Sequence, residues 1–267
     1  MNNKIAFIGA GHLAESLIAG FVRENNDSAA VITASNRSEG KLNALKDKYN
    51  VNITLSNQEA AAGADFVFIT VKPNDYDTVL GEIKDSLNKR SIVITPGAGV
   101  SIAFTESILG ESAKVVRTMP NTPSMLGAGM NAICAGNNVD KADLDRVYEL
   151  FSRLGRCEIV EEKLFDTVTG VSGSGPAYVY MFIDAMANAA EKDGMPREQA
   201  VAFAAQTALG AARMVLETGE DPKALCDSVC SPGGTTIEAV NIFKEEDLYG
   251  LVEKAQHACV KKSESMH

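Results

Sequence analysis

The chain has 267 residues, of which 45% are hydrophobic and 22% charged, and its net charge is −10. This apolar content is enough to build a core, and the length suits one large domain or two ordinary ones. The acidic balance, with no basic run longer than Lys261-Lys262, argues against nucleic acid and anionic membranes as partners.

The first predicted element is a strand in the stretch "KIAFIGAG", residues 4–11. No charged leader followed by a hydrophobic segment comes before it, so we expect a cytoplasmic protein without a secretory signal. The longest apolar stretch, residues 177–190, contains Asp184 and is too short to cross a bilayer. The five cysteines form no C-x-x-C pair, so we expect neither a disulfide framework nor a metal site.

Short β-branched runs alternate with helix-length amphipathic stretches up to about residue 160. We expect strands at residues 5–9, 30–35, 65–71, 91–95, 114–118, 131–135 and 157–160. This alternation is typical of βαβ units and predicts an α/β fold with a largely parallel sheet. The prediction is a Rossmann-type dinucleotide-binding domain over residues 1–161.

The strand signals stop after about residue 162, and the chain becomes rich in Ala, Met and Leu at helical spacing. Gly194 and Pro196 predict the end of one helix and the start of the next, and Asp221-Pro222 predicts an N-cap followed by proline. We therefore expect an all-α domain over residues 162–267. Its stretch 198–216 is apolar on most of its circumference, which predicts a homo-oligomer in which a second subunit helps to cover this helix.

The first strand leads into a G-x-G-x-x-A motif made by Gly9, Gly11 and Ala14. The first glycine permits a tight turn, the second lets a pyrophosphate approach the backbone, and the small third residue lets helix and strand pack closely. Free amides at the start of the helix would hold the phosphates. A plain strand–turn–helix is the alternative, and the N-terminal position favours the dinucleotide site.

The second strand ends in Ser35, Asn36 and Arg37, where an NAD site would have an Asp or Glu. A guanidinium with two short polar groups suits a 2′-phosphate. We therefore expect NADP(H) as the preferred cofactor, with NAD(H) as a second one. The alternative is an arginine in a solvated turn.

Groups for proton transfer are scarce in the sequence. The histidines are His12, His257 and His267, none of which is well placed for a hydroxy-acid mechanism, and no Tyr-x-x-x-Lys pair occurs. No lysine lies between Lys163 and Lys192, where 3-hydroxy-acid dehydrogenases of similar layout have one. Reduction of a cyclic imine that enters already protonated would suit such a site.

The stretch "SVCSPGGTTIEAV", residues 228–240, contains two competing signals for a helix start. In one register Ser231 is the N-cap and Pro232 the first helical residue. In the other, Thr235 is the N-cap and forms a capping box with Glu238.

Neither register explains the adjacent glycines Gly233 and Gly234, and the second leaves Thr236 with a hydroxyl that the fold does not require. Bare amides at a helix N-terminus can bind a carboxylate. We therefore expect an anionic substrate next to a hydride donor.

Six stretches together make the chain recognisable: "FIGAGHLAESLIAG", "VKPNDYDTVL", "PGAGVSI", "RTMPNTP", "GVSGSGPAYVY" and "DSVCSPGGTTIEAV". In this order they closely resemble the pyrroline-5-carboxylate reductase family over essentially the whole length. The resemblance implies NADPH-dependent reduction of 1-pyrroline-5-carboxylate to L-proline, the last step of proline biosynthesis. Cys230 stands where the family usually has a small hydroxyl residue or alanine.

The resemblance also implies which residues form the site. The cofactor would contact Ile8, Gly9, Ala10, Gly11, His12 and Leu13 at its pyrophosphate, Ser35, Asn36 and Arg37 at its ribose phosphate, and Asn57, Val71, Lys72, Pro73, Gly97 and Ala98 along the groove. The substrate would bind between subunits at Ser231, Gly233, Gly234, Thr235 and Thr236, with Thr236 at the ring nitrogen. Subunits of the family exchange helices in a dimer, and dimers often form a pentamer of dimers.

Two other functions stay open at this point. A paralogue could reduce a different cyclic imino acid with the same parts, and a sensor could bind NADPH without catalysis. The intact "SPGGTT" stretch, residues 231–236, disfavours the sensor, which would not need a second anion site. For Lys72 the alternative to a cofactor contact is an ordinary exposed lysine, and we expect Cys230 to be a packing residue.

Overall fold

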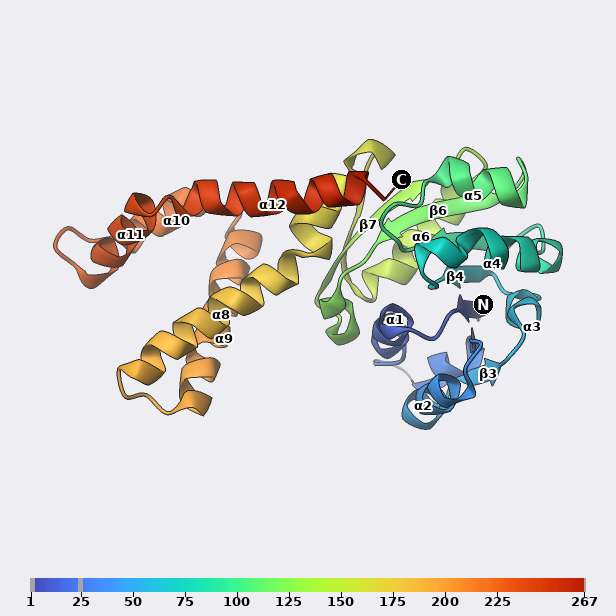
Figure 1. Cartoon of the computed structure of the whole chain (residues 1–267), viewed down its shortest axis with the longest axis horizontal. Coiled ribbons are helices and arrows are strands. Elements are labelled where there is room, and N and C mark those ends of the chain that lie inside the picture. The colour runs from blue at the N-terminus through green and yellow to red at the C-terminus, as the bar shows by residue number, and fades with distance from the viewer. Residues whose placement is uncertain (1–2, 24–25, 267) are drawn as a thin grey trace. The chain divides into compact units, whose positions relative to one another are not determined.

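The computed structural model describes residues 3–23 and 26–266. Within these residues one eight-stranded sheet has the order β3-β2-β1-β4-β5-β6-β7-β8 (Figure 1). The strands are β1 (Ile5–Ile8), β2 (Ile32–Ser35), β3 (Asn52–Thr54), β4 (Phe66–Ile69), β5 (Ile92–Thr95), β6 (Lys114–Met119), β7 (Gly129–Ala135) and β8 (Gly155–Ile159). All neighbouring strands run parallel except β6 and β7, which are antiparallel.

Helices cover both faces of this sheet, as the buried central strands require. Residues Ile5 and Phe7 of β1 belong to one core cluster, and Ala6 and Ile8 belong to the other. The first cluster is closed by α1 (His12–Val22), α2 (Glu39–Tyr49) and α6 (Lys141–Ser152), and the second by α3 (Asn57–Ala61), α4 (Tyr76–Ile83) and α5 (Ile102–Leu109). Phe7 stacks on Phe68 of β4, with 4.7 Å between the ring centroids.

The predicted α/β fold with a largely parallel sheet is confirmed. All seven expected strands are present in the described part of the chain, and β3 is an additional strand. It has three residues, and none of them is fully buried, so its sequence lacks the apolar run that marks the other strands. Short 3₁₀ turns join several elements: η1 (Asn26–Val31), η2 (Pro73–Asp75), η3 (Lys84–Ser86), η4 (Thr122–Leu126) and η5 (Glu162–Leu164).

The chain divides into two compact units, which are described separately. The first contains residues 1–173 and 259–267, and the second contains residues 174–258. The first unit also includes α7 (Phe165–Val168) and a π-helical turn, Thr169–Gly173. The domain boundary that we expected between residues 161 and 162 stays a prediction.

The C-terminal residues pack within the first unit. The hydroxyl of Ser263 donates a hydrogen bond to Asp166 Oδ1 at 2.6 Å. Met266 lies against Gly99, where a Cβ atom would come within 2.7 Å of the Met266 Cβ. The polypeptide therefore leaves the first unit after residue 173 and returns to it at residue 259.

The second unit is helical, as predicted. It contains α8 (Gly175–Lys192), α9 (Arg197–Thr218), α10 (Pro222–Ser228), α11 (Thr235–Glu245) and most of α12 (Leu248–Glu264). Helices α8 and α9 lie side by side (Figure 1) and meet at Ala187, Ala200 and Ala204. The predicted cap is also present, because Asp221 accepts hydrogen bonds from two backbone amides at the start of α10.

Large apolar side chains of the second unit are left exposed. Eleven of those on the described part of the unit are at least half exposed: Tyr180, Met181, Phe203, Leu209, Met214, Leu216, Val229, Ile242, Tyr249, Leu251 and Val252. So many exposed apolar side chains on one unit favour an interaction surface there. No helix in the described residues has the length and apolarity that crossing a membrane requires.

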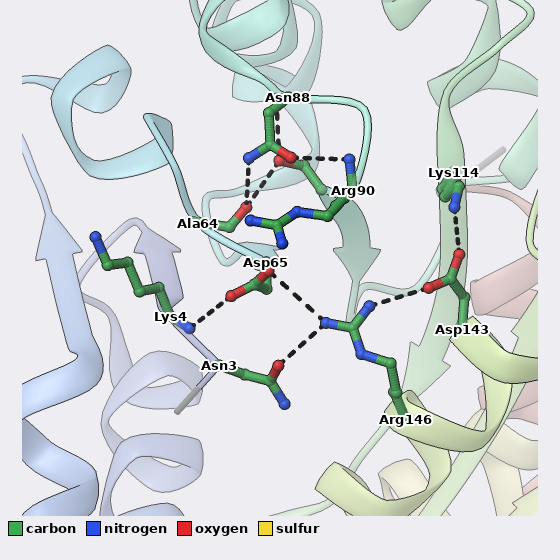
Figure 2. Close-up of polar contacts among 10 residues, drawn as sticks. Asn3, Lys4, Ala64, Asp65, Asn88, Arg90, Lys114, Asp143 and Arg146 are labelled. Carbon is green, nitrogen blue, oxygen red and sulfur yellow. Dashed lines mark hydrogen bonds and ion pairs between the residues drawn. The ribbon is translucent and has the colours of Figure 1, made fainter. Parts of the chain in front are cut away.

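A network of charged side chains joins α6 to the amino ends of three strands (Figure 2). Asp143 accepts hydrogen bonds from Lys114 and from Arg146 Nη1, the latter at 3.0 Å. Arg146 also reaches Asn3 at 3.2 Å and Asp65 at 3.8 Å. Burial opposes ionisation of Asp143, but the hydrogen bonds from Lys114 and Arg146 outweigh it and hold the pKa of this carboxyl below its ordinary value.

We expect Asp143→Asn to lower the free energy of unfolding by about 2 kcal/mol near neutral pH, because two cations lose their shared carboxylate. Since the folded pKa of Asp143 lies below the unfolded value of 3.8, this stabilisation is present above that value and is lost as the pH falls through the folded pKa. Urea unfolding of both proteins from about pH 7 to about pH 3 measures the difference. If the difference in unfolding free energy between the wild type and Asp143→Asn stayed constant into the acid range, the stabilising role of the Asp143 carboxylate would be contradicted.

Candidate cofactor groove and substrate loop

The turn after β1 is held against the end of β4. Gly9 has φ +108°, and a Cβ atom at this position would lie 2.8 Å from the carbonyl carbon and oxygen of Thr70. The Thr70 hydroxyl donates to the carbonyls of Ile8 at 3.1 Å and Gly9 at 2.8 Å. The backbone of this turn therefore leaves no room for a side chain at position 9.

Helix α1 starts directly after this turn. Gly11 is its N-cap and provides no side-chain hydrogen bond, so the first amides of the helix have no cap. Ala14 is completely buried between helix and strand. The three positions of the predicted G-x-G-x-x-A motif thus have the geometry that a phosphate-binding turn requires.

A groove of about 580 Å³ opens along the carboxyl ends of β1, β2 and β4. Eight of the predicted cofactor residues line it: Gly9, Ala10, Gly11, Asn36, Arg37, Asn57, Val71 and Lys72. The other seven do not: Ile8, His12, Leu13, Ser35, Pro73, Gly97 and Ala98. Gly97 and Ala98 follow β5, which lies next to β4 at the same edge of the sheet.

Ser35 does not line the groove. Its side chain is fully buried, and its hydroxyl donates to Asn57 Oδ1 at 2.8 Å. Asn57 in turn donates through Nδ2 to Glu82 at 2.7 Å. Ser35 therefore positions Asn57, which does line the groove.

Arg37 extends into solvent, with 89% of its side chain exposed, and pairs with Asp75 at 3.3 Å. Three charged residues that we had not singled out also line the groove: Lys41, Asp75 and Glu82. They follow β2 and β4 in the chain, so the rule that ligands bind at the carboxyl ends of parallel strands could have identified them.

The loop after β5 is fixed from two sides. Near its start, Gly97 lies beside Tyr76, whose buried hydroxyl donates to the Ile69 carbonyl at 2.7 Å. Burial raises the pKa of Tyr76, so the phenol stays protonated and acts as a structural donor. At the other end, Glu162 Oε1 accepts from the Ile102 amide at 2.8 Å and from Arg117 at 3.1 Å.

Arg117 itself is almost completely buried under this loop. Its guanidinium stacks over the ring of Phe165 at 4.7 Å. Its Nε and Nη2 atoms have no acceptor among the described residues. Burial and the nearby charge of Glu162 raise the pKa of Glu106.

The "SPGG" stretch forms a tight turn. The Gly234 amide donates to the Ser231 carbonyl at 3.0 Å, Pro232 occupies the second position, and Gly233 has φ +70° at the third. These are the features of a type II turn. A Cβ atom at Gly234 would lie 2.6 Å from Ser231 Oγ and 3.1 Å from the Ser231 carbonyl oxygen, so a side chain there would force Ser231 to move.

Both helix registers that we expected from the sequence are wrong. Helix α11 begins at Thr235, and its N-cap is Gly234, without a side-chain hydrogen bond. Pro232 cannot be the first helical residue because the positive φ of Gly233 separates it from the helix. The turn explains both glycines structurally, and its lack of a capping side chain leaves the first amides of α11 open.

The histidines belong to different parts of the chain. His12 is exposed at the start of α1 in the first unit, whereas His257 belongs to α12 in the second unit, 3.9 Å from Glu253. His267 lies outside the described residues. The cofactor groove belongs to the first unit and residues 231–236 belong to the second.

We expect Gly9→Ala and Gly11→Ala to separate the structural and the binding roles of this turn. Gly9→Ala should lower the free energy of unfolding by about 2–5 kcal/mol, because of its positive φ and the overlap with Thr70. Gly11→Ala should fold normally, since its Cβ atom would come no closer than 4.0 Å to Thr70, but should weaken dinucleotide binding. Urea unfolding and the fluorescence of bound NADPH measure the two effects; equal stability of the two variants would contradict this division.

Two family profiles match the chain. One, described as pyrroline-5-carboxylate reductase dimerisation, matches residues 162–266. The other, described as NADP oxidoreductase, coenzyme F420-dependent, matches residues 4–99.

Named relatives cover the chain along its length. The pyrroline-5-carboxylate reductase of Escherichia coli K12 is 44% identical over 266 residues, which is 100% of this chain and 99% of the relative. The human pyrroline-5-carboxylate reductase 2 is 39% identical over 97% of this chain and 83% of its own length.

Solved structures of pyrroline-5-carboxylate reductases are also similar to this chain along its length. The reductase of Coxiella burnetii has a TM-score of 0.89 at 36% identity, covering 100% of this chain and 99% of that one. The Plasmodium falciparum pyrroline carboxylate reductase, solved with NADP bound, has a TM-score of 0.90 at 31% identity, covering 99% and 98%. With the glycine turn after β1, the "SPGGTT" turn and this full-length similarity in one polypeptide, the chain belongs to the pyrroline-5-carboxylate reductase family.

Proposed function

We propose that this protein is an NADP(H)-dependent oxidoreductase that reduces 1-pyrroline-5-carboxylate to L-proline in proline biosynthesis. The observation that supports this function best is the 44% identity with a named reductase along the whole chain. The groove at the glycine turn and the uncapped start of α11 supply the two anion-binding features that such an enzyme needs.

The groove fits a dinucleotide. Gly9 and Gly11 expose backbone where a pyrophosphate would approach, and Arg37 and Lys41 place two cations at the end where a 2′-phosphate would lie. The loop with Gly97 and Ala98 would border the nicotinamide. When bound, the reduced cofactor supplies the hydride, and NAD(H) would bind in the same groove.

The amides around Gly233, Gly234 and Thr235 would hold the substrate carboxylate, with Ser231 shaping the turn. A carboxylate at a helix start is stabilised by unpaired amides and by the helix dipole. The Thr236 hydroxyl would hydrogen-bond the ring nitrogen and so orient the imine. Because a protonated imine needs no strong acid, these groups would suffice for the reaction.

The exposed apolar faces of α8, α9 and α12 and the matched dimerisation domain support a homo-oligomer. We propose a dimer in which subunits exchange helices and bind substrate between them, and a pentamer of dimers as the larger assembly. We also propose a cytoplasmic location, in keeping with the expected reduced cysteines.

The first test follows NADPH oxidation with racemic 1-pyrroline-5-carboxylate, with NADH and with the six-membered cyclic imine in parallel. We expect rapid, NADPH-preferring turnover of the five-membered imine. Preference for the six-membered imine would identify a paralogue with another substrate. Tight NADPH binding without turnover of either imine would identify a sensor and contradict the proposed function.

Thr236→Ala should reduce kcat/KM for the imine about 10- to 100-fold, the range for losing a hydrogen bond to a charged group. Thr236→Ser, which keeps the hydroxyl, should retain most of the activity. Unchanged kinetics in Thr236→Ala would show that this hydroxyl does not orient the substrate.

Light scattering at micromolar concentration should give at least twice the 28.3 kDa mass of one chain. Phe203→Glu, at a position 66% exposed on α9, should shift the protein toward monomers because an interface there would bury an unpaired charge. A wild-type mass of one chain would contradict the proposed assembly, and a mass of ten chains would support the pentamer of dimers.

A further inference from the structure

The ion pair between Arg37 and Asp75 crosses the groove. Arg37 follows β2 and Asp75 follows β4, and these strands flank β1 in the sheet. The pair, with 3.3 Å between Arg37 Nη2 and Asp75 Oδ2, therefore spans the carboxyl end of β1, where the Gly9–Gly11 turn lies.

The two partners are held differently. The Arg37 side chain is 89% exposed and that of Asp75 is 36% exposed. The ion pair is therefore accessible to solvent and weak enough for another anion to replace Asp75 on Arg37. Glu82, the other acidic residue of the groove, is engaged with the Asn57 amide at 2.7 Å. Asp75 is thus the carboxylate in contact with the guanidinium that we assign to the ribose phosphate.

A phosphate dianion would compete with Asp75 for Arg37. A guanidinium has five N–H donors and binds phosphate in a bidentate manner. A bound 2′-phosphate would have to replace the carboxylate or share the guanidinium with it, next to a like charge. A ribose with a free 2′-hydroxyl makes no such demand and leaves the ion pair intact.

We propose that Asp75 is a specificity-determining residue: as the counter-ion of Arg37 it lowers the affinity of the groove for NADP(H) relative to NAD(H). The inference rests on the proposed function, since it requires that the groove binds a dinucleotide. Asp75 thereby moderates the NADP(H) preference that Arg37 creates and leaves the affinity for NAD(H) as it is.

Asp75→Asn tests this inference because it removes the charge and keeps the size of the side chain. Binding is measured by the fluorescence of NADPH and of NADH with the full-length protein, without imine substrate. We expect the Kd for NADPH to fall about two- to fivefold, the range that an exposed ion pair allows, and the Kd for NADH to stay unchanged. The gain should shrink at high salt, which screens exposed charges.

Asp77→Asn is the matched control. It removes the same charge two residues further on, from an exposed position in the first turn of α4 that does not line the groove. This variant should bind both dinucleotides as the wild type does. An equal gain in NADPH affinity in Asp77→Asn would show that the effect comes from general surface charge, and it would overturn the inference.

The double variant Arg37→Ala/Asp75→Asn tests whether Asp75 acts through Arg37. In the Arg37→Ala background, removing the Asp75 charge should no longer change the Kd for NADPH. Three results would overturn the inference: no change in Asp75→Asn, an equal gain for NADH, or a gain that persists without Arg37. Wild-type protein that binds neither dinucleotide would contradict the proposed function itself.

Discussion

The contact between the turn after β1 and the end of β4 determines where the groups of the cofactor groove lie. The Thr70 hydroxyl ties the carbonyls of Ile8 and Gly9 together, and the Gly9 amide donates to the Ser35 carbonyl at 2.9 Å. Three adjacent strands are thus joined at one edge by the Thr70 hydroxyl and by backbone groups. Because no side chain fits between them at position 9, the groove and the start of α1 depend on one glycine.

Structural features that depend on only a few neighbouring residues could be predicted from the sequence. The buried strands, the G-x-G-x-x-A turn and the Asp221 cap follow from local composition, and each is present. The start of α11 was predicted wrongly. Two plausible N-cap residues favoured other helix starts, and the actual start follows a turn that depends on the positive φ of Gly233. Strand β3 was missed because its three residues carry no periodic pattern.

Contacts between site residues that are brought together by the order of the strands could not be predicted from the sequence. The resemblance to the family indicated Arg37 and Asn57, but the partners of these residues come from segments 38 and 25 positions away in the chain. Only the order β2-β1-β4 brings Asp75 to Arg37. Ser35 is buried at the end of β2 and bonds to Asn57, a contact that the sequence does not reveal, and its predicted contact with the cofactor stays a prediction.

The return of the C-terminus to the first unit has a consequence for biosynthesis. Ser263 bonds to Asp166, and Met266 packs on Gly99, so residues near the end of the chain complete a unit whose first strand begins at Ile5. Domains generally form as the chain emerges from the ribosome, N-terminal parts first. Here the helices of residues 174–258 are an insertion within that unit. The first unit therefore gains its contacts with Ser263 and Met266 only after the helices of residues 174–258 have been synthesised.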